Sequence, residues 1–197
     1  MKKALLLSAL SAVVLSLAVP VAAQTRDQEA AFFLGYSYMN FEVEEEDGNR
    51  GGSHGVTADY TYLMDRRFGF VVSAAVNWGS ADSKTNPFEI TGTDVRQSTF
   101  LVGPHATLWR TLTSEFGIRA LAGAAWRTRE GSNTGIEIGD EWGFAAGANA
   151  HLDFRLSDHI WLRAIQPGVE WTRFNDRWQM NWRISAGFVL QAGEILQ

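Results

Sequence analysis

The residues best suited to acid–base or metal chemistry in this chain are its four histidines, His54, His105, His151 and His159. Their separations do not match the short spacings with which one helix or strand presents two histidines to a metal ion. The chain contains no cysteine, so thiolate sites are excluded as well. The sequence therefore predicts neither a metal site nor a bound cofactor.

One histidine lies in a pattern with a charged partner. His151 and Asp153 are two positions apart, so both side chains point to the same face if the segment is a strand, and Arg155 follows on that face. Such a group can form a gate, a hydrolytic site or an internal salt-bridge plug. We favour the plug because buried charges are stable only when they are paired. The full predicted interior network consists of Asp59, His105, Glu115, Arg119, His151, Asp153, Arg155, Arg163 and Arg183.

Nucleophilic catalysis is not expected, and no catalytic residue is predicted. A hydrolytic site requires a nucleophile beside a base, and the apolar faces described below contain no Ser–His pair. The acidic run Glu44–Asp47 has the composition of a divalent-cation or partner site. A solvated loop tip is the interpretation we favour for this run, because charge clusters usually lie in water.

The elements that position these residues are segments in which apolar and polar residues alternate. In one of them Phe116, Ile118 and Ala120 alternate with Gly117 and Arg119. Alternation of this kind predicts β-strands, and no segment shows a sustained helical period. The eight predicted strands cover about 29–42, 54–62, 68–78, 99–108, 115–127, 142–155, 159–174 and 179–190.

The seventh segment is interrupted by Gln166-Pro167-Gly168. Proline has no backbone N–H for the ladder, so we expect a β-bulge there. After this interruption the alternation does not predict which face of the sheet the later residues, including Val169 and Glu170, occupy. Pro104 in the fourth segment raises the same question in a milder form.

The connections between the strands alternate in length. Long polar connections are expected over 43–53, 79–93 and 128–141, and short ones over 63–67, 110–114 and 156–158. An even number of strands with short turns on one side and longer loops on the other is typical of a transmembrane β-barrel with periplasmic termini. The pattern predicts an all-β, eight-stranded, antiparallel, up-and-down transmembrane barrel with acidic loops outside the cell.

Alternation alone does not say which face is outside, because a soluble lipocalin-like barrel with an apolar interior has the same period. Two features favour lipid on the outside. The polar faces hold mainly small residues and a few opposite charges, whereas lysine, common on solvated strands, occurs after residue 23 only at Lys84. Tryptophans near the strand ends also match the aromatic girdles of membrane barrels. The predicted girdle consists of Trp78, Trp109, Trp126, Trp142, Trp161, Trp178 and Trp182.

With these elements the chain resembles the small outer-membrane β-barrel family of bacteria, in its OmpA-type eight-stranded form. The segments that carry the resemblance are Gly35–Tyr38, Phe100–Pro104, Trp161–Arg163 with Gln166, Thr172–Phe174 and Trp182–Gly187. The resemblance covers essentially all of the chain after residue 23. It implies a barrel without a periplasmic domain, inserted by the barrel-assembly machinery. The chain departs from the family pattern in the tail Val189–Gln197, which follows Phe188, where such proteins often end.

Residues 1–23 are predicted to be a secretory signal, and residues 24–197 the barrel domain. Lys2 and Lys3 precede an apolar stretch, and Val21-Ala22-Ala23 precedes the expected cleavage site. The formal charge of −5 argues against nucleic acid as a partner. We therefore expect an exported protein of the bacterial outer membrane that contacts lipid and is a monomer.

Three functions remain open on this evidence. The leading hypothesis is a structural or binding barrel with a side-chain-filled interior. The alternatives are a narrow porin-like channel and a soluble lipocalin-like carrier.

Overall fold

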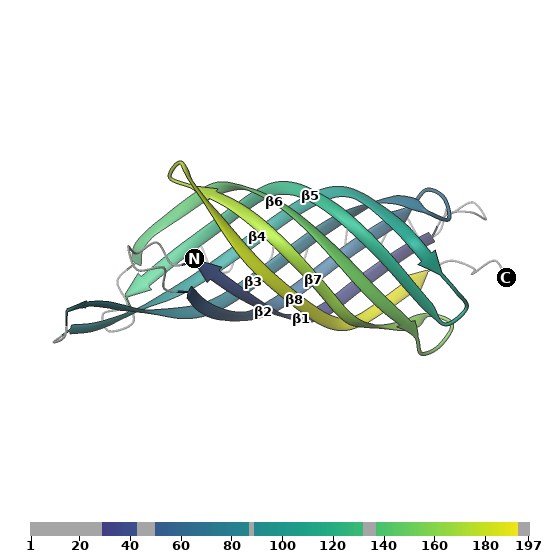
Figure 1. Cartoon of the computed structure of the whole chain (residues 1–197), viewed down its shortest axis with the longest axis horizontal. Helices are drawn as coiled ribbons and strands as arrows, with labels where there is room; N and C mark the ends of the chain where they lie inside the picture. Colours follow the sequence, from purple (N-terminus) through teal and green to yellow (C-terminus); the bar gives the residue numbers. More distant parts are fainter. Residues whose placement is uncertain (1–28, 43–49, 87–88, 132–136, 193–197) are drawn as a thin grey trace, which may run out of the picture.

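Eight antiparallel strands form a closed barrel in the computed structural model, which describes residues 29–42, 50–86, 89–131 and 137–192 (Figure 1). Each strand pairs with the next, and the last pairs with the first, which confirms the predicted fold. The strands are β1 Glu29–Glu42, β2 Arg50–Leu63, β3 Phe68–Asn86, β4 Glu89–Arg110, β5 Ser114–Gly131, β6 Glu137–Arg155, β7 Ile160–Phe174 and β8 Arg177–Ala192. The predicted signal at 1–23 lies outside the described residues. Within those described residues, no helix is long and apolar enough to cross a membrane.

The two ends of the barrel differ in their connections. At one end, here called the terminal end, β1 begins, β8 ends and three short turns join the other strands. In the first of these turns the backbone N–H groups of Arg67 and Phe68 donate to Asp65 Oδ1, which holds the pKa of this exposed carboxyl below its ordinary value. The opposite end, here called the loop end, holds the connections after β1, β3, β5 and β7. The last of these is a tight turn at Asn175 and Asp176, whose φ angles of 47° and 66° fit the turns favoured in hairpins.

The strands extend further toward the loop end than we predicted. Pairing of β3 with β4 continues to Asn86 and Glu89, and pairing of β5 with β6 continues to Glu130 and Glu137. Most of the segments 79–93 and 128–141, expected as loops, are therefore strand. The reason is that a hairpin projecting into water needs no apolar face, so hydrophobic alternation does not mark its end.

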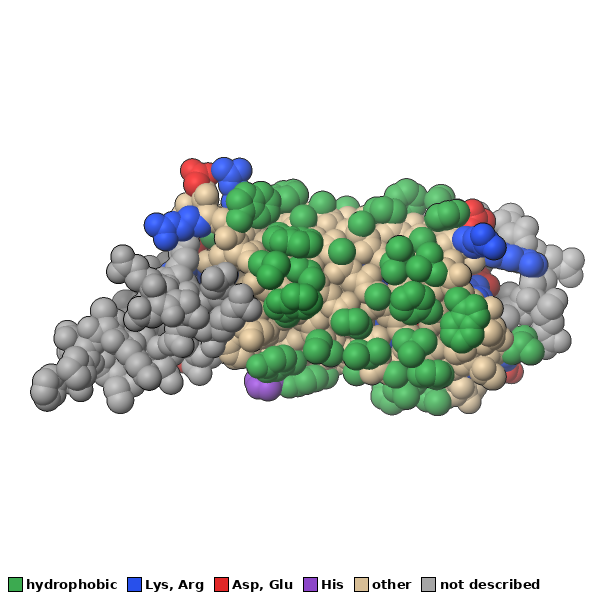
Figure 2. All heavy atoms as spheres, viewed as in Figure 1, with side chains coloured by type: hydrophobic (Ala, Val, Ile, Leu, Met, Phe, Trp, Pro, Cys, Tyr) green, Lys and Arg blue, Asp and Glu red, His purple; other side chains and the backbone are tan. Residues whose placement is uncertain are grey.

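The two faces of the wall are oriented as predicted. Large apolar side chains such as Leu34, Phe70, Phe144 and Phe188 are exposed on the outside. Figure 2 shows hydrophobic side chains spread over the wall between charged residues at the two ends. The buried side chains include many polar and charged ones. This arrangement is the reverse of a lipocalin-like carrier, which places its apolar face inside.

The interior is not wholly polar. Leu101, Leu121 and Phe174 belong to a buried apolar cluster, and Phe33 and Val189 belong to a second one. These residues occupy inward positions of the alternation that are filled elsewhere by polar side chains. An eight-stranded barrel is narrow enough for such side chains to fill it.

The bulge in β7 lies just before the proline rather than at it. Arg163 points inward, Ala164 and Ile165 both lie on the outer face, and Gln166 points inward again. The pairing with β8 shifts register between Arg163 and Gln166. The bulge sets the faces that the sequence left open, so that Glu170 is buried inside and Trp171 is exposed outside.

A second bulge lies in β4, between Thr107 and Trp109, where the pairing with β5 shifts. Leu108 and Trp109 are consequently both exposed on the outer face. Pro104 causes no such shift, because the β4–β5 register is the same on both sides of it.

The barrel closes between β1 and β8 at a pair of inward glycines. Gly35 and Gly187 are register partners there. A Cβ on Gly187 would lie 2.3 Å from the carbonyl oxygen of Leu34 and 2.4 Å from the Cα of Gly35. This close backbone approach requires glycine and allows the first strand to pair with the last.

Candidate functional site

The centre of the barrel interior is organised around the buried carboxylate of Asp59 on β2. Arg119 Nη1 on β5 donates to Asp59 Oδ2 at 2.5 Å, and Ser73 Oγ on β3 donates to Asp59 Oδ1 at 2.7 Å. From β7, Gln166 Nε2 and Arg163 Nη1 donate to Asp59 Oδ2 at 3.2 and 3.4 Å. One carboxylate therefore joins four strands across the interior.

Arg163 extends this arrangement to a second carboxylate. Its Nε and Nη2 atoms donate to the two oxygens of Asp153 on β6, both at 2.8 Å, which is the paired geometry of a strong guanidinium–carboxylate contact. Its Nη1 also donates to Gln166 Oε1 at 3.0 Å. The guanidinium lies over the ring of Phe33, 4.5 Å from the ring centre. Arg163 is thus held by polar and aromatic contacts together.

A chain of longer hydrogen bonds leads from the centre toward the terminal end. Arg119 Nε donates to His105 Nδ1 at 3.4 Å. Because His105 Nδ1 accepts this bond, its Nε2 carries the proton and donates to Thr107 Oγ1 at 3.1 Å. The Thr107 hydroxyl in turn donates to Glu115 Oε1 at 3.5 Å. The chain links a guanidinium to a carboxylate through one histidine ring.

His151 on β6 stacks against His105, with ring centres 5.2 Å apart. Its Nε2 atom lies 3.7 Å from Glu115 Oε1 and 3.9 Å from Asp153 Oδ2, outside hydrogen-bond distance. Among the described residues, neither ring nitrogen of His151 has a hydrogen-bond partner, although the side chain is buried. The sequence did not predict that these two histidines meet, because they are far apart along the chain.

The terminal mouth of the barrel is crossed by Arg110. This residue forms ion pairs with Glu29 at 2.8 Å and with Glu115 at 2.6 Å. Arg155 was predicted to belong to the interior network, but its side chain lies outside that network. Its guanidinium pairs with the exposed Asp158 at 2.6 Å and contacts the carbonyl of Leu112. It comes after the last inward layer of β6, so its long side chain reaches the turns instead of His151.

A second polar group lies nearer the loop end. Arg127 Nη2 donates to Gln179 Oε1 at 2.6 Å and to Gln97 Oε1 at 3.0 Å, and its guanidinium lies over the ring of Phe174. Gln97 Nε2 donates to Glu170 Oε1, and Glu170 pairs with Arg183 at 3.1 Å. This group joins β4, β5, β7 and β8.

The buried charges of the described residues balance. Four arginines and four carboxylates are buried: Arg119, Arg127, Arg163 and Arg183, with Asp59, Glu115, Asp153 and Glu170. Ion pairs in a low-dielectric interior are stable when each partner is neutralised and hydrogen-bonded. An interior with paired charges is suited to holding strands together, while the His105–Glu115–His151 cluster is its best candidate for ligand chemistry.

The tryptophans predicted as a girdle lie outside, with one exception. Trp78, Trp109, Trp142, Trp178 and Trp182 are exposed on the outer wall, and the half-buried Trp126 stacks on Trp142 with ring centres 5.5 Å apart. The exception is Trp161, which does not belong to the girdle because it is only 2% exposed and packs inside with Phe33 and Val189. It shares its face with Arg163, two residues away, and therefore points inward.

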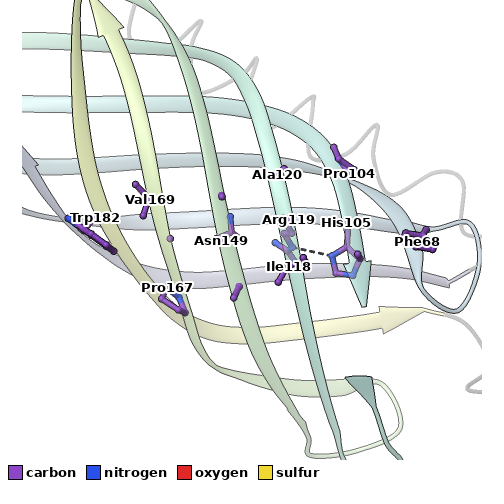
Figure 3. A pocket seen from close by; sticks show the side chains of 14 residues that line it. Phe68, Pro104, His105, Ile118, Arg119, Ala120, Asn149, Pro167, Val169 and Trp182 are labelled. Atoms are coloured by element: carbon purple, nitrogen blue, oxygen red, sulfur yellow. Dashed lines mark hydrogen bonds between the residues drawn. The ribbon is translucent and has the colours of Figure 1, made fainter. Parts of the chain in front are cut away.

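The outer wall carries a shallow groove of about 600 Å³. Its outer lining is built mostly from small and apolar residues between Phe68 and Trp182, which include Pro104, Ala106, Ile118, Ala120, Ala148, Ala150, Pro167 and Val169 (Figure 3). His105 and Arg119, joined by a dashed line in Figure 3, border it but are buried. Such an apolar surface is suited to hydrocarbon chains.

Several interior residues were missing from the predicted network. Arg127 lies on the polar face of its strand, so strict alternation was a sufficient signal for it. Gln166 and Glu170 lie beyond the β7 bulge, and Arg110 lies beyond the β4 bulge. No local pattern placed these three.

Comparison with known proteins supports the architecture. The chain matches the family model described as "Outer membrane protein beta-barrel domain" over residues 9–188. None of the curated proteins searched matches it. Similar solved structures include Ail of Yersinia pestis in complex with the heparin analogue sucrose octasulfate, at 17% identity, a TM-score of 0.55 and coverage of 83% of this chain and 99% of that one.

Two further structures are similar in fold. Neisserial surface protein A is 8% identical with a TM-score of 0.57, covering 81% of this chain and 97% of that one. OprG of Pseudomonas aeruginosa is 13% identical with a TM-score of 0.50, covering 85% and 97%. The structure is a closed eight-stranded barrel with an outward apolar face, and the family model matches most of the chain. The chain therefore belongs to the outer membrane protein beta-barrel family.

Proposed function

We propose that this protein is a non-conducting, non-catalytic barrel with a structural or binding role at the bacterial surface. The observation that supports this proposal is the ion-pair arrangement of Asp59, Arg119, Arg163 and Asp153 across the centre of the interior. A narrow pore needs a continuous water-filled path, and these side chains occupy the cross-section that such a path would use.

Planar-bilayer recording tests this proposal against the narrow pore. We expect no steady single-channel conductance from the folded protein, while a general porin prepared in the same way conducts. The contrary result is a steady conductance that changes when Arg119 is replaced by methionine. Migration that differs between heated and unheated detergent samples establishes that the inserted protein is folded.

The binding role is assigned to the loop end, which we place outside the cell. The sequence around the first loop is acidic, with Glu44, Glu45, Glu46 and Asp47 together. The structurally similar Ail is named an attachment protein and was solved with a sulfated heparin analogue. The acidic sequence here favours a cationic partner over a polyanion of that kind.

We further propose that residues 1–23 direct export and are removed, after which the barrel-assembly machinery inserts the protein into outer-membrane lipid as a monomer. Amino-terminal sequencing of the protein purified from outer membranes should begin at Gln24. Light scattering in detergent should give the mass of a single chain. A retained amino terminus at Met1 contradicts the processing, and a doubled mass contradicts the monomer.

A further inference from the structure

Three potential metal ligands converge in the terminal half of the interior. His105 on β4, Glu115 on β5 and His151 on β6 are all buried, and one donor atom from each lies within 4.8 Å of the other two. The contact from His151 Nε2 to Glu115 Oε1 is 3.7 Å. A tetrahedral zinc site with bonds of about 2.0–2.1 Å separates its donors by about 3.3–3.4 Å. Small side-chain rotations are enough to reach that geometry.

The backbone makes room for the two rings. Gly117 on β5 is the register partner of His151 on β6, and its partner on β4, Thr107, lies two residues after His105. A Cβ at Gly117 would lie 2.4 Å from Cε1 and 2.9 Å from Nε2 of His151, and 3.0 Å from Cε1 of His105. Only glycine at this position of β5 lets the rings from β4 and β6 meet across it.

The cluster borders a cavity of about 20 Å³, lined also by Asp153 and by Arg110 and Glu29 at the terminal mouth. A space of this size holds one water-sized species. Both nitrogens of the buried His151 ring lack hydrogen-bond partners among the described residues, and buried polar atoms without partners are unfavourable. A cation bound by one of these nitrogens would supply the missing interaction.

We propose that His105, Glu115 and His151 form a binding site for a divalent transition-metal ion, for which Zn²⁺ is the best match. Two imidazole nitrogens and one carboxylate oxygen are a ligand set that suits Zn²⁺, with water in the fourth position. Glu115 Oε2 remains paired with Arg110, which leaves Oε1 for the metal. The site is independent of whether the barrel conducts.

Binding at His105 Nε2 requires the other tautomer of His105 and a small shift of Arg119 Nε away from the new Nδ1–H. The proton on Nε2 moves to Nδ1, which ends the hydrogen bonds to Thr107 and from Arg119, at 3.1 and 3.4 Å. Arg119 keeps its short ion pair with Asp59. Four carboxylates, Glu29, Glu115, Asp153 and Asp59, pair with the guanidinium groups of Arg110, Arg119 and Arg163 around the cluster. The metal therefore enters surroundings with one more carboxylate than guanidinium group.

The test is titration of the untagged, detergent-folded full-length barrel with Zn²⁺ in competition with a chromophoric chelator. We expect one site per chain. Zinc affinity should fall at least about 100-fold in the double variant His105→Gln/His151→Gln, and separately in Glu115→Gln. Removing a residue that only hydrogen-bonds a metal ligand already lowers metal affinity about 10–100-fold. The matched control, His54→Gln with His159→Gln, removes the same number of histidines from the outer wall and the terminal turn and should bind like the original protein.

Two results overturn the proposal: original protein that binds Zn²⁺ no more tightly than the His105/His151 variant, or a control variant that loses binding. Titration of the original protein with Co²⁺ decides the question even if the interior variants fail to fold. Intense visible absorption bands of a tetrahedral site support the proposal, and the weak bands of hexahydrated Co²⁺ overturn it.

Discussion

Replacing Asp59 with asparagine should lower the free energy of unfolding by about 3–5 kcal/mol, the range found when one partner of a buried ion pair is removed. Asparagine keeps the shape of the side chain and removes its charge. Arg119, whose closest anion is Asp59 at 2.5 Å, then remains buried without its main counter-ion. Arg163 loses a weaker contact at 3.4 Å and keeps its paired contact with Asp153. The loss should therefore come mainly from Arg119.

The measurement is a urea titration of the barrel folded in lipid vesicles, followed by tryptophan fluorescence. The matched control is Asp158→Asn, which makes the same chemical change in a pair with Arg155 at the terminal end. The Asp158 side chain is 81% exposed, so this variant should lose no more than about 1 kcal/mol. Equal losses in the two variants would show that the interior charges are solvated and that the network does not hold the strands together.

A double variant separates an unpaired charge from a packing defect. Adding Arg119→Met to Asp59→Asn removes the stranded guanidinium while keeping most of its volume. Most of the lost stability should return, because replacing a buried pair with apolar groups is often neutral. If the stability losses of the two substitutions simply add, Arg119 is stabilised by its other contacts, such as that with Thr61.

The fold was predictable because strand alternation is a local property. In β5 and β6, alanines and aromatic residues face outward along the wall, most inward positions hold glycine or polar residues, and the structure places every second side chain inside. The same logic placed Asp59, Arg119, Arg163 and Arg183 correctly on inward faces. What alternation provides is the face of a residue and not its partner.

The predictions failed where the position of a residue along the barrel axis, or the register of its strand, decides which residues it contacts. Arg155 is on the expected face but lies beyond the interior, so it pairs with Asp158. Trp161 was assigned by its place near a strand end, although its parity with Arg163 already pointed inward. The meeting of His105 with His151 depends on the register of three strands and on a glycine between them, and no spacing in the chain contains that information.

An arginine at position 148 tests which solvent the outer wall meets. Ala148 is exposed on β6, between the outward Trp142 and Phe154, and lines the outer groove. Ala148→Arg should lower the free energy of unfolding in vesicles by about 2–4 kcal/mol, the cost of a cation near the bilayer midplane on a barrel surface. In water the same change on an exposed strand has little effect, because surface substitutions usually stay within about 0.5 kcal/mol.

Ala148→Leu is the matched control, because it adds a side chain to the same groove without adding charge. Leucine suits hydrocarbon and the groove has space for it, so this variant should retain full stability. If both variants lose the same amount, the effect is steric and the groove is a packing contact. If neither loses stability, the apolar band does not face lipid at this depth. If hydrocarbon surrounds β6, only the arginine variant should lose stability, because hydrocarbon does not solvate its charge.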